Sequence, residues 1–196
     1  MRDLLLRAYQ TARLEAFDMA HRSRADRVGI IGYGVAELYE GDRREGHKLF
    51  VPFGNLITDA GDMYYAGKGI TGISPAAPAA PTAANGMKLG TGVTAAVKAD
   101  AGLITYLTAS NVVFDATFPS TSNLGTTLGV NAVYKTTWAA GVATNAAITE
   151  VAIVNDQATN ADSTAANTYS RAVFTAINKA AGDSLAITWN HKFLGA

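Results

Sequence analysis

Hydrophobic and polar residues alternate along the C-terminal part of the chain. Leu185, Ile187 and Trp189 are separated by small or polar residues, and the segment 169–177 has the same two-residue period. This is the period of a β-strand that turns one face to a core. The sequence NKAAGD between the two segments is typical of a turn. The pattern therefore predicts that the last two strands pair as a long hairpin.

Similar patterns predict strands earlier in the chain. Residues 133–138 are rich in Thr and aromatic residues, and residues 147–154 form a mostly apolar run that contains one carboxylate, Glu150. A polar loop is expected at 155–167. Short strands separated by turns are typical of sandwich folds. We therefore expect a mainly β protein, namely a β-sandwich of the jelly-roll or immunoglobulin-like kind.

The segment 35–57 is predicted to form a β-hairpin. Its strands are expected at 35–39 and 48–57, joined by a polar turn at 41–46. Pro52 has no backbone N–H to donate, which favours an edge position or a bulge in the second strand.

The middle of the chain has a less regular pattern. Residues 87–92 predict a strand that ends at a tight turn, and residues 93–110 predict a short helix followed by a strand. Residues 111–118 are expected to be extended, and residues 119–124 are expected to form a loop.

An amphipathic helix is predicted at the N-terminus, over residues 3–25. Leu5 and Tyr9 begin a stripe of apolar residues at helical spacing, with Phe17 near the same face. Two interpretations are open, because such a helix could pack on its own domain or act as an arm that docks on a partner subunit.

A short internal helix is predicted over residues 58–67. Thr58 can cap its first turn, Asp59 and Asp62 suit the positive end of the helix, and Gly67 can end it. Two nearby carboxylates could also suggest catalytic acids. We interpret them instead as residues that stabilise the start of the helix.

Glycines recur at two places that resemble nucleotide-binding loops. The run 29–34 has the spacing of the dinucleotide fingerprint reversed and follows a predicted helix, so we expect a flexible joint there. Gly90 and Gly92 are not followed by the Lys-Ser or Lys-Thr of a phosphate loop. Neither run therefore predicts a cofactor.

The chain is expected to have two parts. Residues 1–34 would form a helical arm with a glycine-rich joint, and residues 35–196 would form the β-sandwich body. Within the body, residues 71–86 contain three prolines among Ala and Thr. This composition predicts an extended linker or surface loop.

Composition narrows the possible functions. Sixteen basic residues balance sixteen acidic ones, which gives no electrostatic support for nucleic-acid binding. Neutral proteins tend to associate, so the balance favours a component of an assembly. Cysteine is absent, which excludes disulfides, thiolate metal sites and cysteine nucleophiles. No secretory signal or membrane span is predicted, so we expect synthesis and assembly in a cytoplasm.

Candidate catalytic or metal-binding groups are few. His21, His47 and His191 have no metal-site spacing, and each is expected to be a surface histidine. Glu150 is expected to face solvent or an arginine of another subunit, such as Arg171. The loop 155–162 offers oxygen ligands but lacks the glycine and glutamate of an EF-hand. We therefore predict no catalytic, cofactor or metal site, and no enzyme activity.

Several stretches together resemble a family of small structural proteins of tailed-bacteriophage particles. They cover most of residues 35–196 and comprise ELYEGDRREGHKLF (37–50), GNLITDAGDMYYA (54–66), MKLGTG (87–92), LITYLTASNVVFDATFP (103–119), YKTTWAAGVATNAAITEVAIVND (134–156) and AINKAAGDSLAITWNHKFLGA (176–196). The N-terminal helix and the Pro/Ala-rich segment fall outside the resemblance.

The resemblance implies a non-enzymatic virion protein with a β-sandwich body. We favour a capsid cement or decoration protein that forms a homo-oligomer, most often a trimer, and bridges subunits of the major capsid protein. The arm would supply partner contacts through apolar and basic side chains: Leu5, Tyr9, Arg13, Phe17, Arg22 and Arg24. The expected partners exclude nucleic acid and membranes.

Two alternatives stay open. The chain could be a neck or tail adaptor, or a fibre-anchoring protein, whose N-terminal residues insert into a portal or tail ring. It could also be a glycan- or host-surface-binding module, since sandwich folds often serve this use. Glycan binding would require exposed aromatic residues clustered on one face, for which the candidates are Tyr64, Tyr65, Tyr106 and Trp138.

Overall fold

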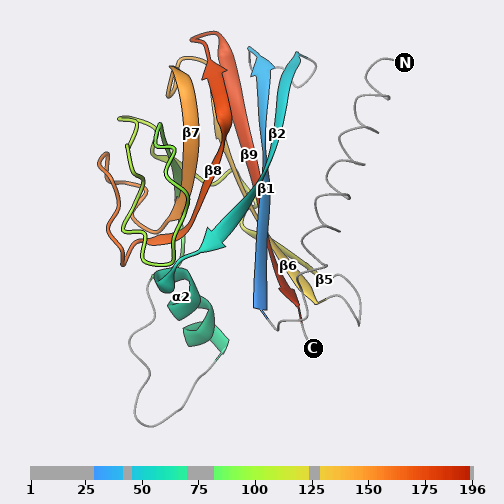
Figure 1. The fold of residues 1–196 in the computed structure, drawn as a ribbon. Coiled ribbons are helices and arrows are strands. Elements are labelled where there is room, and N and C mark those ends of the chain that lie inside the picture. The colour runs from blue at the N-terminus through green and yellow to red at the C-terminus, as the bar shows by residue number, and fades with distance from the viewer. Residues whose placement is uncertain (1–28, 42–45, 70–81, 124–128, 195–196) are drawn as a thin grey trace.

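The computed structural model describes residues 29–41, 46–69, 82–123 and 129–194. These residues form nine strands and one helix (Figure 1). In chain order they are β1 (Gly29–Glu40), β2 (His47–Ile57), α2 (Asp59–Gly69), β3 (Gly86–Gly90), β4 (Val112–Val113), β5 (Ser120–Asn123), β6 (Val130–Trp138), β7 (Asn145–Val154), β8 (Thr168–Lys179) and β9 (Asp183–Leu194). The predicted N-terminal helix and most of the Pro/Ala-rich segment lie outside the described residues.

The strands form one curled antiparallel sheet in the order β4-β3-β7-β8-β2-β1-β9-β6-β5. We divide it into a first half-sheet, β2-β1-β9-β6-β5, and a second half-sheet, β4-β3-β7-β8. Among the described residues, strand pairing between the two occurs only where Leu56 and Ile57 of β2 pair with Arg171 and Ser170 of β8. The prediction of a mainly β protein is confirmed, but the strands are hydrogen-bonded into one sheet rather than two separate ones.

The core lies inside the curl, between the two half-sheets. The alternating residues Leu185, Ile187 and Trp189 are fully buried there, as the two-residue period predicted. Phe53 of β2 packs against both halves, with its ring centroid 5.4 Å from that of Phe174 and 5.2 Å from that of Trp189. The core is therefore shared between the half-sheets.

The predicted hairpin of β8 and β9 is wrong. β8 pairs with β7 and with the end of β2, whereas β9 pairs with β1 and β6. The turn at 180–182 therefore carries the chain from one half-sheet to the other (Figure 1). The alternation marked both strands correctly, but it does not contain the identity of their partners.

The predicted glycine joint is also wrong, because the run 29–34 is the first half of β1. Gly32 and Gly34 lie where side chains of β2 cross the strand. A Cβ added at Gly32 would lie 1.6 Å from Oδ1 of Asn55, and one at Gly34 would lie 2.3 Å from Cζ of Phe53. The glycines therefore leave room for the side chains of Asn55 and Phe53. Because β1 begins at Gly29, the β-sheet body begins before residue 35.

The middle of the chain differs from its prediction in two places. Residues 93–110 form neither a helix nor a strand and consist of irregular turns apart from one bridge between Gly90 and Tyr106. Residues 120–123, expected in a loop, form β5 and pair with β6. β5 has the sequence STSN, so it has no alternation of hydrophobic and polar residues from which a strand could be predicted.

The N-terminal hairpin and the internal helix are confirmed. β1 and β2 pair antiparallel, and Pro52 lies on the stretch of β2 that β8 does not reach, which is a local edge. The Thr58 hydroxyl accepts a hydrogen bond from the Gly61 N–H at 3.3 Å, as expected of a helix cap. The helix α2 ends at Gly69, two residues later than predicted.

Candidate partner-binding surface

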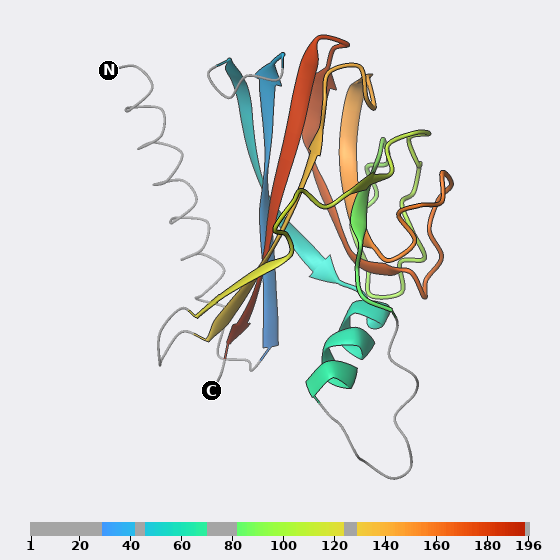
Figure 2. The ribbon, with the colours of Figure 1, turned by 180° about the vertical axis from the view of Figure 1, so that it is seen from behind.

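Two irregular segments, residues 91–111 and 155–167, lie beside β7 and β8 in both views (Figures 1 and 2). We call them the loop layer. Leu103 and Tyr106 from the first segment pack against Ala152 and Val154 of β7 and form a second, smaller hydrophobic cluster. The second half-sheet is therefore covered on its outer face as well as on its core face.

Charged residues on the outer face of the second half-sheet hold this layer. Lys88 of β3 and Arg171 of β8 both pair with Ala152 of β7, so the three side chains share one face. Glu150 lies two residues before Ala152 and therefore points the same way. Lys88, Glu150 and Arg171 are all fully buried. Buried charges require partners, and the loop layer supplies many of them.

Glu150 is the centre of the first anchor. Its Oε2 accepts two hydrogen bonds from Arg171, at 2.9 Å from Nε and 2.8 Å from Nη2. Its Oε1 accepts the backbone N–H groups of Gly92 and Thr105, both at 2.8 Å. One carboxylate thus binds a guanidinium within the sheet and two distant points of the loop layer.

Arg171 extends the same anchor. Its Nη1 donates to Oδ2 of Asp100 at 3.1 Å, and its Nη2 donates to the carbonyl of Thr94 at 2.8 Å. Asp100 also accepts the Val97 N–H at 2.9 Å. Arg171 was named from the sequence as a possible partner of Glu150, but in another subunit. The two residues instead pair within one chain and out of contact with solvent.

Gly90 and Gly92 permit this close approach. A Cβ at either position would lie 2.5 Å from Oε1 of Glu150. At Gly92 it would also lie 2.6 Å from Cβ of Ile104. These glycines therefore serve the contact between loop and carboxylate.

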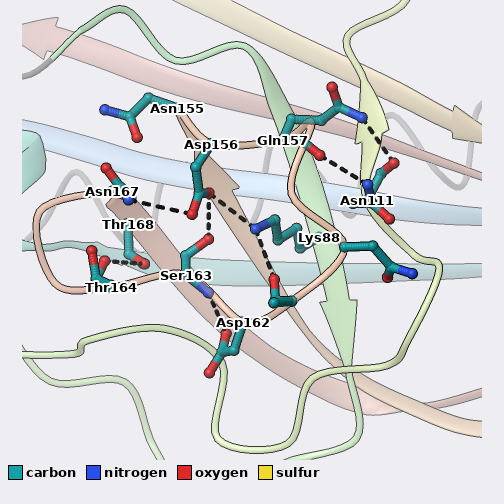
Figure 3. Close-up of polar contacts among 12 residues, drawn as sticks. Lys88, Asn111, Asn155, Asp156, Gln157, Asp162, Ser163, Thr164, Asn167 and Thr168 are labelled. Carbon is teal, nitrogen blue, oxygen red and sulfur yellow. Dashed lines mark hydrogen bonds and ion pairs between the residues drawn. The ribbon is translucent and has the colours of Figure 1, made fainter.

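A second anchor is centred on Lys88 (Figure 3). Its ammonium donates to Oδ1 of Asp156 at 3.0 Å and to the carbonyl of Ala161 at 2.8 Å. Ser163 donates to the same Asp156 oxygen at 2.6 Å. The acidic loop considered as a calcium site thus surrounds a lysine of its own chain. The described residues contain no group of three His, Asp or Glu side chains that could hold a metal ion.

The two segments of the loop layer also bind each other. Asn111 and Gln157 exchange side-chain to backbone hydrogen bonds, both at 2.9 Å (Figure 3). Oδ1 of Asp162 accepts the Leu103 N–H at 3.0 Å. The layer is therefore cross-linked internally as well as fixed to the sheet.

This fixed layer carries apolar side chains on its exposed side. Val93 is 75% exposed, Val97 54% and Ile104 51%. Val93 follows the anchored Gly92, and the N–H groups of Val97 and Ile104 are bonded to Asp100 and Glu150. Large apolar side chains that are exposed on an anchored backbone are candidates for contact with another protein. No sequence pattern indicated these exposed positions, because they lie in the segment predicted as a helix and a strand.

The other candidate residues lie elsewhere. The predicted arm contacts Leu5, Tyr9, Arg13, Phe17, Arg22 and Arg24 lie outside the described residues. Asp62 forms an ion pair with Lys98 of the loop layer, which agrees with a structural role. His47 lies 3.7 Å from a carboxylate oxygen of Glu37 and is partly buried.

His191 is fully buried, so its prediction as a surface residue is wrong. Its Nδ1 is hydrogen-bonded to the hydroxyl of Tyr65 from α2, and its Nε2 lies 3.3 Å from Nδ2 of Asn55. Burial lowers the pKa of His191 from 6.5 to about 3, so the ring is neutral at physiological pH. The side chains of Tyr65, Asn55 and His191 therefore link α2 to β2 and β9. The His191 side chain has no contact with solvent.

The aromatic residues named for glycan binding do not form an exposed face. Trp138 is fully buried and donates its indole N–H to the Ser110 carbonyl at 2.7 Å. Tyr64 stacks on Tyr169 with centroids 5.0 Å apart, and Tyr65 packs against His191. The four candidates therefore do not supply the cluster that this interpretation requires.

Comparison of the chain with protein-family models, with curated proteins and with solved structures found no match. Among the described residues, no helix is long and apolar enough to cross a membrane.

Proposed function

We propose that the chain is a structural protein of a tailed-bacteriophage particle, and specifically a cement protein that binds the outer shell. The resemblance over most of residues 35–196 supports the class of protein. In this proposal the two half-sheets serve as the layers of a jelly-roll or immunoglobulin-like sandwich, and the loop layer contacts the major capsid protein.

The observation that carries the proposal is that the loop layer exposes apolar side chains on a backbone that is hydrogen-bonded to buried carboxylates. Val93, Val97 and Ile104 are held beside backbone groups that bind Glu150 or Asp100. A surface that is already ordered loses little conformational entropy when it binds. Such construction suits a protein that makes a permanent contact and performs no reaction.

The proposed mechanism is mechanical. Copies that bridge neighbouring capsid subunits add contact area, which must be broken before the shell can open under the pressure of packaged DNA. A specific contact needs roughly 1,000 Å² of buried surface. Many symmetric copies then multiply a modest affinity through avidity. The N-terminal residues proposed as an arm would add a second contact on the same shell.

Copy number tests the proposal against its main alternative. Purified particles of the phage that encodes the chain are separated on a quantitative gel, and the band is compared with that of the major capsid protein. A cement protein is expected in hundreds of copies. A neck or tail adaptor would be present in six, twelve or a few dozen copies, and absence from the particle would refute both.

A surface variant tests the contribution of the loop layer. Val93→Asp places a charge on a side chain that is 75% exposed, so folding is expected to be retained while attachment to particles lacking the protein falls. Val130→Asp is the matched control, because Val130 is 43% exposed on β6 of the first half-sheet. If both variants attached to the particles at equal occupancy, the loop layer would not be part of the contact with the shell.

A further inference from the structure

The outer face of the first half-sheet differs in character from one strand to the next. Successive residues of β1 and β2 alternate between the core and this face, so the neighbours of the buried Ala36 and Phe53 point outward. On these two strands the outward residues form an apolar patch of adjacent side chains: Tyr33, Val35, Phe50 and Pro52. Over β9 and β6 the same face is mostly polar, with Thr188, Asn190, Lys135 and Thr137.

The apolar patch has no cover within the part of the chain that the structure describes. Tyr33, Phe50 and Pro52 are partly exposed, and Val35 between them is buried. The loop layer covers the outer face of the second half-sheet, but no described segment lies over β1 and β2 on the side away from β7 and β8 (Figures 1 and 2). An antiparallel sheet can leave a polar face in water, whereas an apolar patch on that face favours a covering element.

The chain itself contains a segment suited to this patch. Residues 1–28 lie outside the described residues and lead directly into Gly29, the first residue of β1. The sequence predicts an amphipathic helix over residues 3–25, and its apolar stripe includes Leu5, Tyr9 and Ala12. Only residues 26–28 separate this helix from β1, so a chain reversal there would bring the helix over the hairpin.

The dimensions of the predicted helix and of the hairpin agree. A helix over residues 3–25 is roughly 34 Å long and about 10 Å wide. The strand β1 spans roughly 40 Å, and two neighbouring strands occupy about 10 Å of the width of the sheet. At about 1.5 Å per helical residue and about 3.3 Å per strand residue, Ala12 comes level with Val35 and Tyr9 comes close to Phe50.

We propose that residues 3–25 form a helix whose apolar stripe packs on the outer face of β1 and β2 of the same chain. Because the segment is continuous with β1, its effective concentration at the patch exceeds that of a second copy. This packing corresponds to the first of the two interpretations that the sequence left open. Arg13, Arg22 and Arg24 lie off the stripe and stay available for the proposed contact with a shell, on which the packing does not depend.

Two charge substitutions in the full chain test whether the helix packs on the body. Ala12→Asp places a charge on the apolar stripe, and the matched control Gln10→Asp places the same charge on the far side of the helix. The two tryptophans of the chain lie in β6 and β9, so their fluorescence reports the urea midpoint of the body. Ala12→Asp is expected to lower that midpoint, and Gln10→Asp is expected to leave it nearly unchanged. Equal midpoints for both variants would overturn the inference.

The absence of cysteine permits a second test that locates the packing. Thr188 of β9 pairs with Val35, so Ala12→Cys combined with Thr188→Cys brings two thiols within reach of a short bis-maleimide. The expected product is a monomer in which one linker joins the two cysteines, identified by mass spectrometry of the linked peptides.

Ala12→Cys combined with Thr94→Cys is the control for the cross-link, because Thr94 is exposed in the loop layer beside the other half-sheet. This pair is expected to give no internal link. Linked dimers would assign the helix to a second copy, and equal internal linkage of both pairs would deny it a fixed position, so either result overturns the inference. These tests use the chain alone and leave the proposed attachment of the loop layer to a shell unaffected.

Discussion

At the scale of single residues, the buried carboxylate of Glu150 binds four other residues. It accepts hydrogen bonds from Arg171 and from the backbone of Gly92, Ile104 and Thr105. A buried ion pair contributes little net stability when compared with an apolar pair of the same shape. Removing one member is costly, however, because the other charge remains buried. Its role here is to fix the loop layer in one position.

We expect Glu150→Gln to lower the free energy of unfolding by about 3–5 kcal/mol. The glutamine amide has one acceptor oxygen in place of two, so its NH2 group must face either the donors of Arg171 or the N–H groups of Gly92 and Thr105. The guanidinium also stays buried without this counter-charge. Urea unfolding at neutral pH measures the change.

Glu37→Gln is the matched control for this substitution. Glu37 is partly exposed and lies 3.7 Å from His47, so its loss should cost less than about 1 kcal/mol. If the two variants were equally stable, the anchoring role of Glu150 would be wrong.

His191 predicts a pH dependence of stability. Its pKa is lowered from 6.5 to about 3 by burial, so the unfolded chain takes up a proton below pH 6.5 that the folded chain does not. The free energy of unfolding must therefore fall as the pH is lowered from 6.5 towards 3, by up to about 1.4 kcal/mol per pH unit from this group. Carboxylates add to the total slope, so the difference between variants is the informative quantity.

Urea midpoints between pH 7 and pH 4 measure this difference. His191→Gln is expected to be less stable at pH 7 but to lose less stability on acidification than the unmodified chain. Parallel pH profiles for His191→Gln and the unmodified chain would show that His191 is not the buried neutral group described above.

At the scale of elements, β1 shows why glycines occur inside a central strand. β1 pairs with β9 along its whole length and with β2 on the other side. Phe53 of β2 crosses over Gly34 to reach Trp189, with the two rings edge to face. A side chain on β1 would separate these rings, so the glycine serves core packing rather than chain flexibility.

Gly34→Ala is expected to destabilise the protein by about 1–3 kcal/mol through overpacking. Its Cβ would lie 2.3 Å from Cζ of Phe53 and 3.0 Å from the Thr188 carbonyl oxygen. Gly182→Ala serves as the control, because no atom lies within 4 Å of the added carbon. Combining Gly34→Ala with Phe53→Leu should cost less than the sum of the two single changes. Simple additivity would indicate that the clash is not with Phe53.

Elements whose signal is local could be predicted from the sequence. The alternation around Leu185 and Trp189 and the cap at Thr58 each depend on neighbouring residues, and all were correctly placed. The partners of each strand could not be predicted, because the pairing of β9 with β1 rather than with β8 depends on the whole fold. The candidate surface could not be predicted either, because it depends on contacts between distant residues. Arg171, for example, binds Asp100, which lies 71 residues earlier in the chain.

At the scale of the whole molecule, the chain alternates between the two half-sheets. β1 and β2 belong to the first, β3 and β4 to the second, β5 and β6 to the first, β7 and β8 to the second, and β9 to the first. The hydrophobic core contains residues of both halves. Neither half-sheet is a continuous piece of chain with its own core, so the described body is expected to unfold as one cooperative unit.

Ile153→Ala tests this cooperativity. Ile153 is fully buried in β7 of the second half-sheet, and its truncation should cost about 2–5 kcal/mol. Both tryptophans, Trp138 and Trp189, belong to the first half-sheet, yet their fluorescence should report the same lowered urea midpoint as far-ultraviolet circular dichroism. The exposed Val130→Ala should leave both midpoints nearly unchanged. If fluorescence kept the original midpoint while the dichroism signal moved, the half-sheets would be independent units, because a defect in one could not reach the tryptophans of the other.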